Sequence, residues 1–398
     1  MIYLDHNATT PMLPEVAAAM AECYTAVYAN PASAHQAGRR ARQVLEDSRE
    51  SIAAMLGVRL DGAQGGRLIF TSGGTESNNL AILGLSGDSH ARVVVSSIEH
   101  PSVLEPADEL ARRGWDVERS RVSSDGVVDL EHLAAVLDDR TRVASVMFAS
   151  NETGVIQPIQ QIASLCARYG IPLHTDAVAA VGKLPIDFAS LGAATLSASA
   201  HKFHGPRGIG LLAIGGGITL RPSLFGGPQQ HGLRPGTEDV ALAVGMELAL
   251  RRWNDDRHDH VRRMTHLRDR FESRLRAGWH ELVIHGASVD RVGQTSNVAF
   301  LGLDRQALLM ALDLAGVACS VGSACSSGSS ELSPTLVAMG CETALLESSL
   351  RFSMGTLTTE FELDEAVRRI LRVCHDLRGR TSEPIRPTKP REKSQKAI

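Results

Sequence analysis

The chain has 398 residues, of which 43% are hydrophobic and 22% are charged, and its formal net charge is -4. This composition excludes a mainly disordered chain, and the length indicates two domains at roughly 100–200 residues each. Because 41 basic residues are balanced by 45 acidic ones, bulk electrostatic binding to nucleic acid is not expected. No apolar run reaches the roughly 18 residues of a membrane span, so no membrane partner is expected either.

The chain begins Met-Ile-Tyr-Leu-Asp-His, without the basic and apolar segments of a signal peptide. Its cysteines form no CxxC pair, so neither a zinc site nor a thioredoxin-like site is expected. Unpaired cysteines are typical of a reduced compartment, and we expect a cytoplasmic protein without a metal site. The six cysteines are Cys23, Cys166, Cys319, Cys325, Cys341 and Cys374.

Residues 14–250 alternate short apolar runs with helical patterns such as Ile159–Tyr169. Several of the runs are continuously apolar, as expected of strands buried on both faces of a sheet. This alternation predicts an α/β fold with a mostly parallel sheet covered by helices, whose ligand site lies at the carboxyl ends of the strands. The expected strands are Leu68–Phe70, Arg92–Ser97, Arg142–Phe148, Pro172–Thr175, Thr195–Ser197 and Gly208–Ile214.

The C-terminal third has a different composition. Apolar residues at three- and four-residue steps predict one amphipathic helix from about Trp253 to Leu282, leading into a smaller α/β domain. The last residues, Thr381–Ile398, contain three prolines and five lysines or arginines, so we expect a mobile basic tail.

Two segments of the large region carry polar residues directly after expected strands. Phe70–Leu80 passes from a strand through Thr-Ser-Gly-Gly-Thr to a helix, and such a helix start binds anions, although an ordinary N-capped turn explains it as well. Thr75 adds a hydroxyl donor there. Asp176 ends an apolar strand, and a buried carboxylate needs a partner. A protonated pyridine nitrogen and a structural arginine or backbone group are equally good partners.

Two further segments carry nucleophiles. Lys202 follows a strand, lies among small residues near Ser199 and His201, and precedes a Gly/Pro loop. Most lysines are solvated, but this setting favours a desolvated amine that forms Schiff bases. Cys325 lies in a run of serines and glycines, which favours a travelling thiol over a packing role, whereas Cys319 resembles a packing cysteine. A phosphate cradle, a carboxylate, an activated lysine and a mobile thiol together suit pyridoxal 5′-phosphate.

The chain resembles the cysteine desulfurases, which are fold-type I pyridoxal-phosphate enzymes of the class V aminotransferase group. The resemblance runs in order through nearly the whole chain, and the long Ser/Gly segment resembles the group with an extended catalytic loop. The matching strings are Tyr-Leu-Asp-His-Asn-Ala-Thr-Thr-Pro (3–11), Asn-Pro-Ala-Ser (30–33), Thr-Ser-Gly-Gly-Thr-Glu-Ser (71–77), Glu-His-Pro-Ser (99–102), Asn-Glu-Thr-Gly (151–154), Ala-His-Lys (200–202), Arg-Pro-Gly-Thr (234–237), Gly-Ser-Ala-Cys-Ser (322–326) and Leu-Arg-Phe-Ser-Met-Gly (350–355).

The resemblance implies a fold-type I transferase with a seven-stranded, mostly parallel sheet sandwiched by helices. It implies a large cofactor-binding domain at 14–256, a small domain made of 1–13 and 257–380 that carries the catalytic cysteine loop, and a flexible tail at 381–398. It also implies a homodimer with shared active sites.

For the site, the resemblance implies that Lys202 binds the cofactor as a Schiff base and that Asp176 pairs with its pyridinium nitrogen. His100 would stack on the ring and assist proton transfer. Cys325 would take the sulfur of L-cysteine as a persulfide, release L-alanine and pass the sulfur to an acceptor protein of iron–sulfur assembly, tRNA thiolation or DNA phosphorothioation.

The remaining implied roles concern binding. Gly74, Thr75, Ser199 and His201 would hold the phosphate, and Thr237 would reach the phosphate of the neighbouring subunit. Asn151, which would also contact the cofactor, would position the substrate together with Arg351 and Asn30. Arg351 would hold the substrate carboxylate by a two-pronged pair.

The chain departs from the family pattern at two places. Ala179 stands where relatives usually have a glutamine whose amide donates to the phenolate oxygen of the cofactor, so we expect a shifted pKa of the Schiff base and weaker activity. Glu-Leu-Ser-Pro (331–334) follows the loop where relatives usually have Leu-Glu-Pro. Two alternatives stay open: another class V enzyme, such as a selenocysteine lyase or an aminotransferase, and a catalytically impaired scaffold that would explain Ala179.

Overall fold

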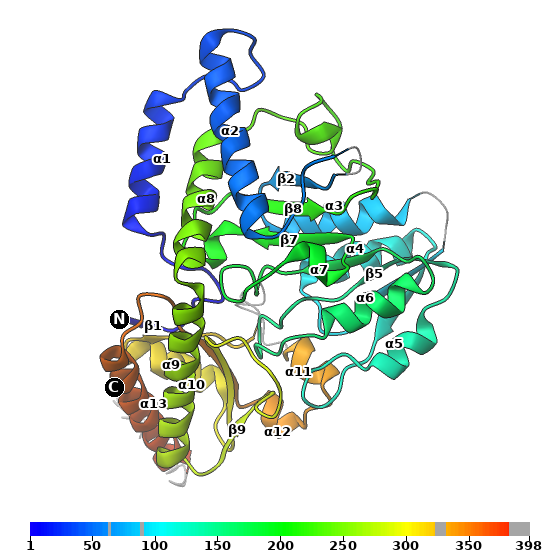
Figure 1. The fold of residues 1–398 in the computed structure, drawn as a ribbon. Helices are drawn as coiled ribbons and strands as arrows, with labels where there is room; N and C mark the ends of the chain where they lie inside the picture. The colour runs from blue at the N-terminus through cyan, green and yellow to red at the C-terminus, as the bar shows by residue number, and fades with distance from the viewer. Residues whose placement is uncertain (63–64, 88–90, 323–331, 382–398) are drawn as a thin grey trace, which may run out of the picture.

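A computed structural model describes residues 1–62, 65–87, 91–322 and 332–381. The expected α/β fold is confirmed, with a seven-stranded sheet at its centre (Figure 1). β8 runs antiparallel to both of its neighbours, and the other strand pairs in this sheet are parallel. In sheet order the strands are β2 (Arg67–Thr71), β8 (Gly210–Ile214), β7 (Thr195–Ser199), β6 (Leu173–Asp176), β5 (Thr141–Ser145), β3 (Arg92–Ser96) and β4 (Asp116–Ser120).

Both faces of this sheet are buried, which explains why its strands are apolar at successive positions. Leu68, Leu173 and Leu196 pack on one face, whereas Ile69 and Val93 pack on the other. The first face is covered by α1 (Pro14–Ala26), α2 (Gln36–Met55), α5 (Leu130–Val136), α6 (Ile159–Ala167), α7 (Phe188–Leu191) and α8 (Val240–Asp255). The second is covered by α3 (Gly74–Ser86) and α4 (Pro101–Arg112).

β4 was absent from the strands expected on apolar grounds. Its sequence, Asp-Val-Glu-Arg-Ser, carries three charged residues. β4 is an edge strand, which has a neighbouring strand on one side only. A strand at that position does not need the continuous apolar run on which the expectation rested.

The C-terminal part has its own three-stranded antiparallel sheet and its own apolar cluster, which lie below the large sheet in Figure 1. The N-terminal strand β1 (Ile2–Tyr3) joins this part by pairing with β11, and Ile2 and Leu4 belong to its cluster. The domain boundaries expected from the resemblance stay a prediction. The elements are α9 (Arg257–Gly278), β9 (Leu282–Ile284), β10 (Thr295–Phe300), α10 (Arg305–Leu314), β11 (Val317–Ala318), α11 (Pro334–Ala338), α12 (Thr343–Leu346), β12 (Ser349–Ser353) and α13 (Glu360–Thr381).

The expectation of a single helix from Trp253 to Leu282 was wrong. The chain forms two helices, α8 and α9, and Asp256 between them has φ of -117° and ψ of 23°, outside helical geometry. Trp253 packs with α8 into the cluster of the large sheet, whereas Met264, Leu267 and Phe271 of α9 pack into the C-terminal cluster. Because of this break, α8 and α9 pack into two different apolar clusters.

None of the helices in the described ranges is long and apolar enough to cross a membrane. The expected mobile tail falls on residues 382–398, outside the described part of the chain, except for its first residue, with which α13 ends.

Candidate active site

A cavity of about 190 Å³ opens at the carboxyl ends of the central strands. Nine of the residues singled out in the sequence line it, although they are spread over more than 270 positions of the chain. They are Gly74, Thr75, His100, Asn151, Asp176, Ser199, His201, Lys202 and Arg351. The cavity is also lined by Asn7, Ala8, Asn78, Ser102, Met147, Ala149, Val178, Ala179 and Lys183.

Lys202 is carried into this cavity by a short 3₁₀ turn, η1 (Ala200–Lys202), that follows β7 directly. Its amine donates hydrogen bonds to the backbone carbonyls of Asn7 and Ala8, the latter at 2.9 Å. Two backbone oxygens of the N-terminal segment therefore hold the Lys202 amine at the cavity.

Asp176 ends β6 and is 6% exposed. Its Oδ1 accepts hydrogen bonds from the backbone N–H of Val178 at 2.9 Å and from Ser197 Oγ at 3.3 Å, and its Oδ2 accepts one from Asn78 Nδ2 at 2.8 Å. No ion pair with arginine or lysine is formed by Asp176 in the described part of the chain. These neutral donors leave Asp176 without a cationic partner of its own, so it suits a cation that enters the cavity.

A chain of hydrogen bonds leads from Asp176 through Asn78 to His174. Asn78 Oδ1 lies 3.0 Å from His174 Nε2, and His174 Nδ1 lies 2.8 Å from Thr195 Oγ1. Burial lowers the pKa of His174 to about 4, so its ring is neutral near pH 7. Because the Asn78 amide nitrogen donates to Asp176, its oxygen must accept, which assigns the His174 proton to Nε2.

His100 is the N-cap of α4, since its Nδ1 accepts from the backbone N–H of Ser102 at 3.1 Å. The same nitrogen lies 2.7 Å from Ser102 Oγ, which fixes the orientation of the ring at the cavity wall. Burial lowers the pKa of His100, the Lys202 charge lowers it further, and Asp176 opposes the shift. A neutral imidazole held in this way can stack on a flat ring and accept a proton.

The first turn of α3 forms one end of the cavity. Gly74 and Thr75 offer backbone N–H groups there, and Ser199 and His201 lie beside them. A Cβ atom at Gly74 would lie only 2.7 Å from Val178 Cγ2, so a larger residue would require the Val178 side chain to move. This cradle, the Lys202 amine and the Asp176 carboxylate fit the phosphate, aldehyde and pyridine nitrogen of pyridoxal phosphate.

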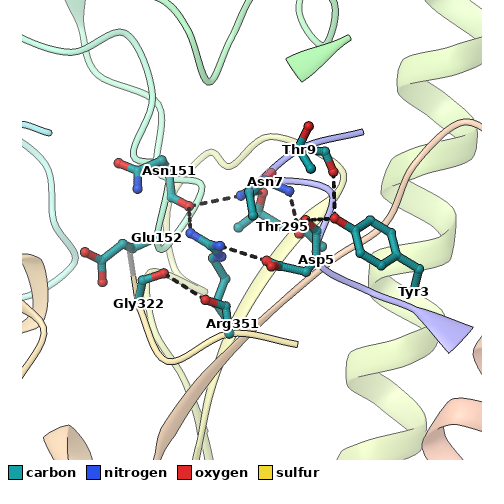
Figure 2. Close-up of polar contacts among 12 residues, drawn as sticks. Tyr3, Asp5, Asn7, Thr9, Asn151, Glu152, Thr295, Gly322 and Arg351 are labelled. Carbon is teal, nitrogen blue, oxygen red and sulfur yellow. Dashed lines mark hydrogen bonds and ion pairs between the residues drawn. The ribbon is translucent and has the colours of Figure 1, made fainter. Parts of the chain in front are cut away.

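Arg351, on β12, is 1% exposed and reaches the cavity from the C-terminal sheet. Figure 2 shows its guanidinium between Asp5 Oδ1, at 2.8 Å, and the carbonyl oxygen of Asn151, at 3.1 Å. The ion pair with Asp5 is the partner that a buried arginine requires. Its Nε has no hydrogen-bond partner in the described structure, so the group retains one donor.

Two of the expected site residues, Asn30 and Thr237, do not line the cavity. Asn30 is exposed, and its Oδ1 accepts from the backbone N–H of Ala32. Thr237 is exposed as well and borders a separate hollow beside α2 and β2. Cys325 lies outside the described residues. Cys319 is confirmed as a packing cysteine, because it packs against the C-terminal cluster and burial raises the pKa of its thiol.

Sequence reasoning missed four polar residues of the site, namely Asn7, Asn78, Ser102 and Lys183. Asn7 donates to the carbonyl of Asn151 at 3.0 Å and to Thr295 Oγ1 at 2.9 Å, so it joins the two halves of the molecule (Figure 2). Asn7 and Asn78 lie within or next to the quoted strings 3–11 and 71–77, which was the available indication.

Among the described residues, no group of three or more histidine, cysteine, aspartate or glutamate side chains is placed to hold a metal ion.

Comparison with known proteins decides the family, because the model of the aminotransferase class-V family matches residues 2–365. The chain belongs to this family. It is 38% identical over 380 residues to the cysteine desulfurase IscS of Dictyoglomus turgidum, covering 95% of both chains. It is 38% identical over 380 residues to the cysteine desulfurase NifS of Azotobacter vinelandii, covering 95% of this chain and 94% of the relative.

The fold of this class-V family member also matches a solved structure described as a NifS-like protein. The two have a TM-score of 0.87 and 31% sequence identity, and the match covers 94% of this chain and 100% of the other. The resemblance seen in the sequence, and the fold-type I architecture that it implied, are therefore confirmed.

Proposed function

We propose that the chain is a pyridoxal-phosphate-dependent cysteine desulfurase. It converts L-cysteine to L-alanine and transfers the sulfur, as a persulfide on Cys325, to an acceptor protein. The observation that carries the proposal is one cavity in which the Lys202 amine, the Asp176 carboxylate and the first turn of α3 face one another. The names of the relatives at 38% identity support the same activity.

In this proposal the cofactor supplies an aldehyde that bonds to an amine and a ring that draws electrons from the substrate. Lys202 would hold the cofactor and would move protons at the substrate carbons. Asp176 keeps the pyridine nitrogen protonated, His100 covers the ring and assists proton transfer, and Gly74, Thr75, Ser199 and His201 bind the phosphate. Asn151 and Arg351 position the substrate, and Asn30 assists.

The sulfur step needs no outside oxidant. The Cys325 thiolate forms a bond to the substrate sulfur while the carbon–sulfur bond breaks. The electron pair of the broken bond stays with the substrate carbon, which takes up a proton and leaves as part of alanine. A thiol of the acceptor protein then removes the sulfur from Cys325.

The Cys325→Ser variant tests the proposal. We expect it to keep the visible absorption of the bound cofactor and to lose alanine formation from cysteine, whereas Lys202→Ala should lose both. Alanine formation that survives in Cys325→Ser would refute the persulfide route. A purified wild-type chain that binds no pyridoxal phosphate would instead support the scaffold alternative, and faster turnover of selenocysteine than cysteine in Cys325→Ser would support a selenocysteine lyase.

The partners belong to the proposal as well. A homodimer with shared sites would place Thr237 against the phosphate of the neighbouring subunit. Thr237 lies in the segment 215–239, which also exposes Leu224 (51%) and Phe225 (87%), as a surface covered by a second subunit would. The acceptor belongs to iron–sulfur assembly, tRNA thiolation or DNA phosphorothioation. A cytoplasmic location agrees with the five described cysteines, which are all free.

A further inference from the structure

A second lysine reaches the cavity. Lys183 is only 9% exposed, and its amine makes a single hydrogen bond, to Asn7 Oδ1 at 3.3 Å. It forms no ion pair with any described residue. A buried ammonium without an anionic partner is costly, so a lysine in this position indicates that an anion comes close to it in the working protein.

The charges that act on Lys183 are positive, which increases the cost of its buried ammonium. Burial, together with the positive charges of Lys202 and Arg351, lowers its pKa to about 7. In turn, the pKa values of His6, His201 and His204 are lowered mainly by burial and in part by the charge of Lys183. The Asp176 carboxylate lines the same cavity but forms no ion pair with Lys183.

The position of Lys183 is set by a single helical turn after β6. The N–H of Val181 bonds to the carbonyl of Ala177 at 2.8 Å, and that of Leu184 bonds to the carbonyl of Ala180 at 2.9 Å. Gly182, with φ of 74°, ends this turn, and the N–H of Lys183 bonds to the carbonyl of Ala180 at 3.0 Å.

Ala179 and Lys183 both line the cavity. A longer side chain at position 179 would occupy part of the cavity that Lys183 also lines.

We propose that Lys183 is a cofactor-binding residue whose amine lies beside the ring oxygen of pyridoxal phosphate, in the place of the donor that Ala179 lacks. The inference rests on the cofactor of the proposed function and adds a residue to it. The ring oxygen is the resident anion that the uncompensated cation requires, whereas a substrate carboxylate already has Arg351.

The test is the pH titration of the visible absorption band of the protein reconstituted with pyridoxal phosphate, without substrate. A cation next to the ring oxygen disfavours protonation of the Lys202–cofactor bond. Lys183→Met and Lys183→Gln should each raise the titration midpoint by about one pH unit or more, whereas Lys183→Arg, which keeps the charge, should move it far less. The apo forms of the neutral variants should unfold at or above the wild-type temperature, because a buried charge is removed.

Ala179→Gln is a second test of the same proposal. A glutamine there enters the cavity that Lys183 also lines and offers a donor to the same ring oxygen, so Ala179→Gln should shift the midpoint by itself, and adding Lys183→Met to it should change little more. Additive shifts in the double variant would mean that the two residues act on different groups.

The proposal is overturned if Lys183→Met and Lys183→Gln titrate like the wild type. It is equally overturned if neither variant folds, since Lys183 then serves the core, or if only their affinity for cysteine falls, since the charge then serves the substrate. A wild-type chain that shows the visible band but releases no alanine from cysteine would refute the proposed function and leave this test intact.

Discussion

Glu99 is a buried carboxyl group next to the cofactor cavity. Its Oε1 accepts a hydrogen bond from the backbone N–H of Met147 at 2.6 Å, and burial, together with the nearby charge of Asp176, raises its pKa to about 8. Near pH 7 the residue is therefore a neutral acid. Glu99 therefore adds no negative charge beside the Asp176 carboxyl group near pH 7.

This difference predicts how stability depends on pH. Between about pH 4.5 and pH 8 the folded protein holds the Glu99 proton and the unfolded chain has lost it, so Glu99 makes stability fall as pH rises, by up to about 1.4 kcal/mol per unit. Glu99→Gln removes this contribution. In denaturant unfolding of the apo protein, the variant should gain on the wild type steadily from pH 5 to pH 8.

Glu109→Gln is the matched control, because Glu109 pairs with Arg112 and Arg113 at the surface. Arginine pairing lowers the pKa of Glu109, so its substitution should produce no such trend above pH 5. A constant difference between Glu99→Gln and wild type across this range would show that Glu99 is ionised throughout, contrary to the expectation.

At the level of residues, the sequence predicts the groups whose chemistry is local and misses those whose role depends on distant contacts. Residues such as Lys202, Asp176 and His100 lie at the ends of expected strands or in recognisable sequence motifs. Nine of these residues line one cavity. Asn78 acquires its role from Asp176, 98 positions away, and Lys183 from Asn7, 176 positions away. No local pattern encodes such pairings, because they are made by the packing of whole elements.

At the level of elements, Glu152 connects the turn after β5 to the segments that flank residues 323–331. Its two carboxylate oxygens accept hydrogen bonds from Ser333 Oγ at 2.5 Å and from Thr335 Oγ1 at 3.1 Å. On the other side, a Cβ atom at Gly322 would lie 3.2 Å from Glu152 Oε2. One buried carboxylate thus contacts the chain before and after the segment that contains Cys325.

Ser333 also caps α11, since its Oγ accepts from the backbone N–H of Leu336 at 3.1 Å. Ser333→Ala removes the cap and one partner of buried Glu152, and we expect it to lower the free energy of unfolding by about 1–2 kcal/mol. It should also slow alanine formation while the visible band of the cofactor stays unchanged. Ser164→Ala, at an exposed position of α6, is the control and should change neither value. Equal effects of the two substitutions would contradict a role of Ser333 in holding this segment.

The elements themselves differ in how well the sequence predicts them. Strands of the large sheet are predicted because burial on both faces demands continuous apolar runs, and Gly208–Ile214 and Thr195–Ser197 are found within two residues of β8 and β7. The break at Asp256 is not predicted, because the charged residues around it suit a solvated helix as well as a helix end. Only the division of the apolar residues between two clusters requires it.

At the level of the whole molecule, the first ten residues join the two cores. β1 pairs with β11 of the C-terminal part, and a few residues later Asn7 and Ala8 accept hydrogen bonds from Lys202 at the end of β7. Thr10 then donates to the carbonyl of His201 at 2.8 Å. Arg351 and Lys202, which come from different sheets, are positioned in one cavity because this short segment contacts both.

The proposed dimer predicts that each active site takes Lys202 from one protomer and Thr237 from the other. Thr237→Ala should weaken cofactor binding roughly 10- to 100-fold, because a hydrogen bond to a charged group contributes about 1.5–3 kcal/mol. Lys202→Ala should lose the visible band altogether. In a hybrid of one Lys202→Ala and one Thr237→Ala protomer, one site carries both substitutions and the other carries neither. Co-expressed and purified through two different tags, the hybrid should therefore regain a tight cofactor site and alanine formation at half the wild-type level. A hybrid whose sites both remain defective, or a wild-type chain that sediments as a monomer, would show that each protomer builds its site alone.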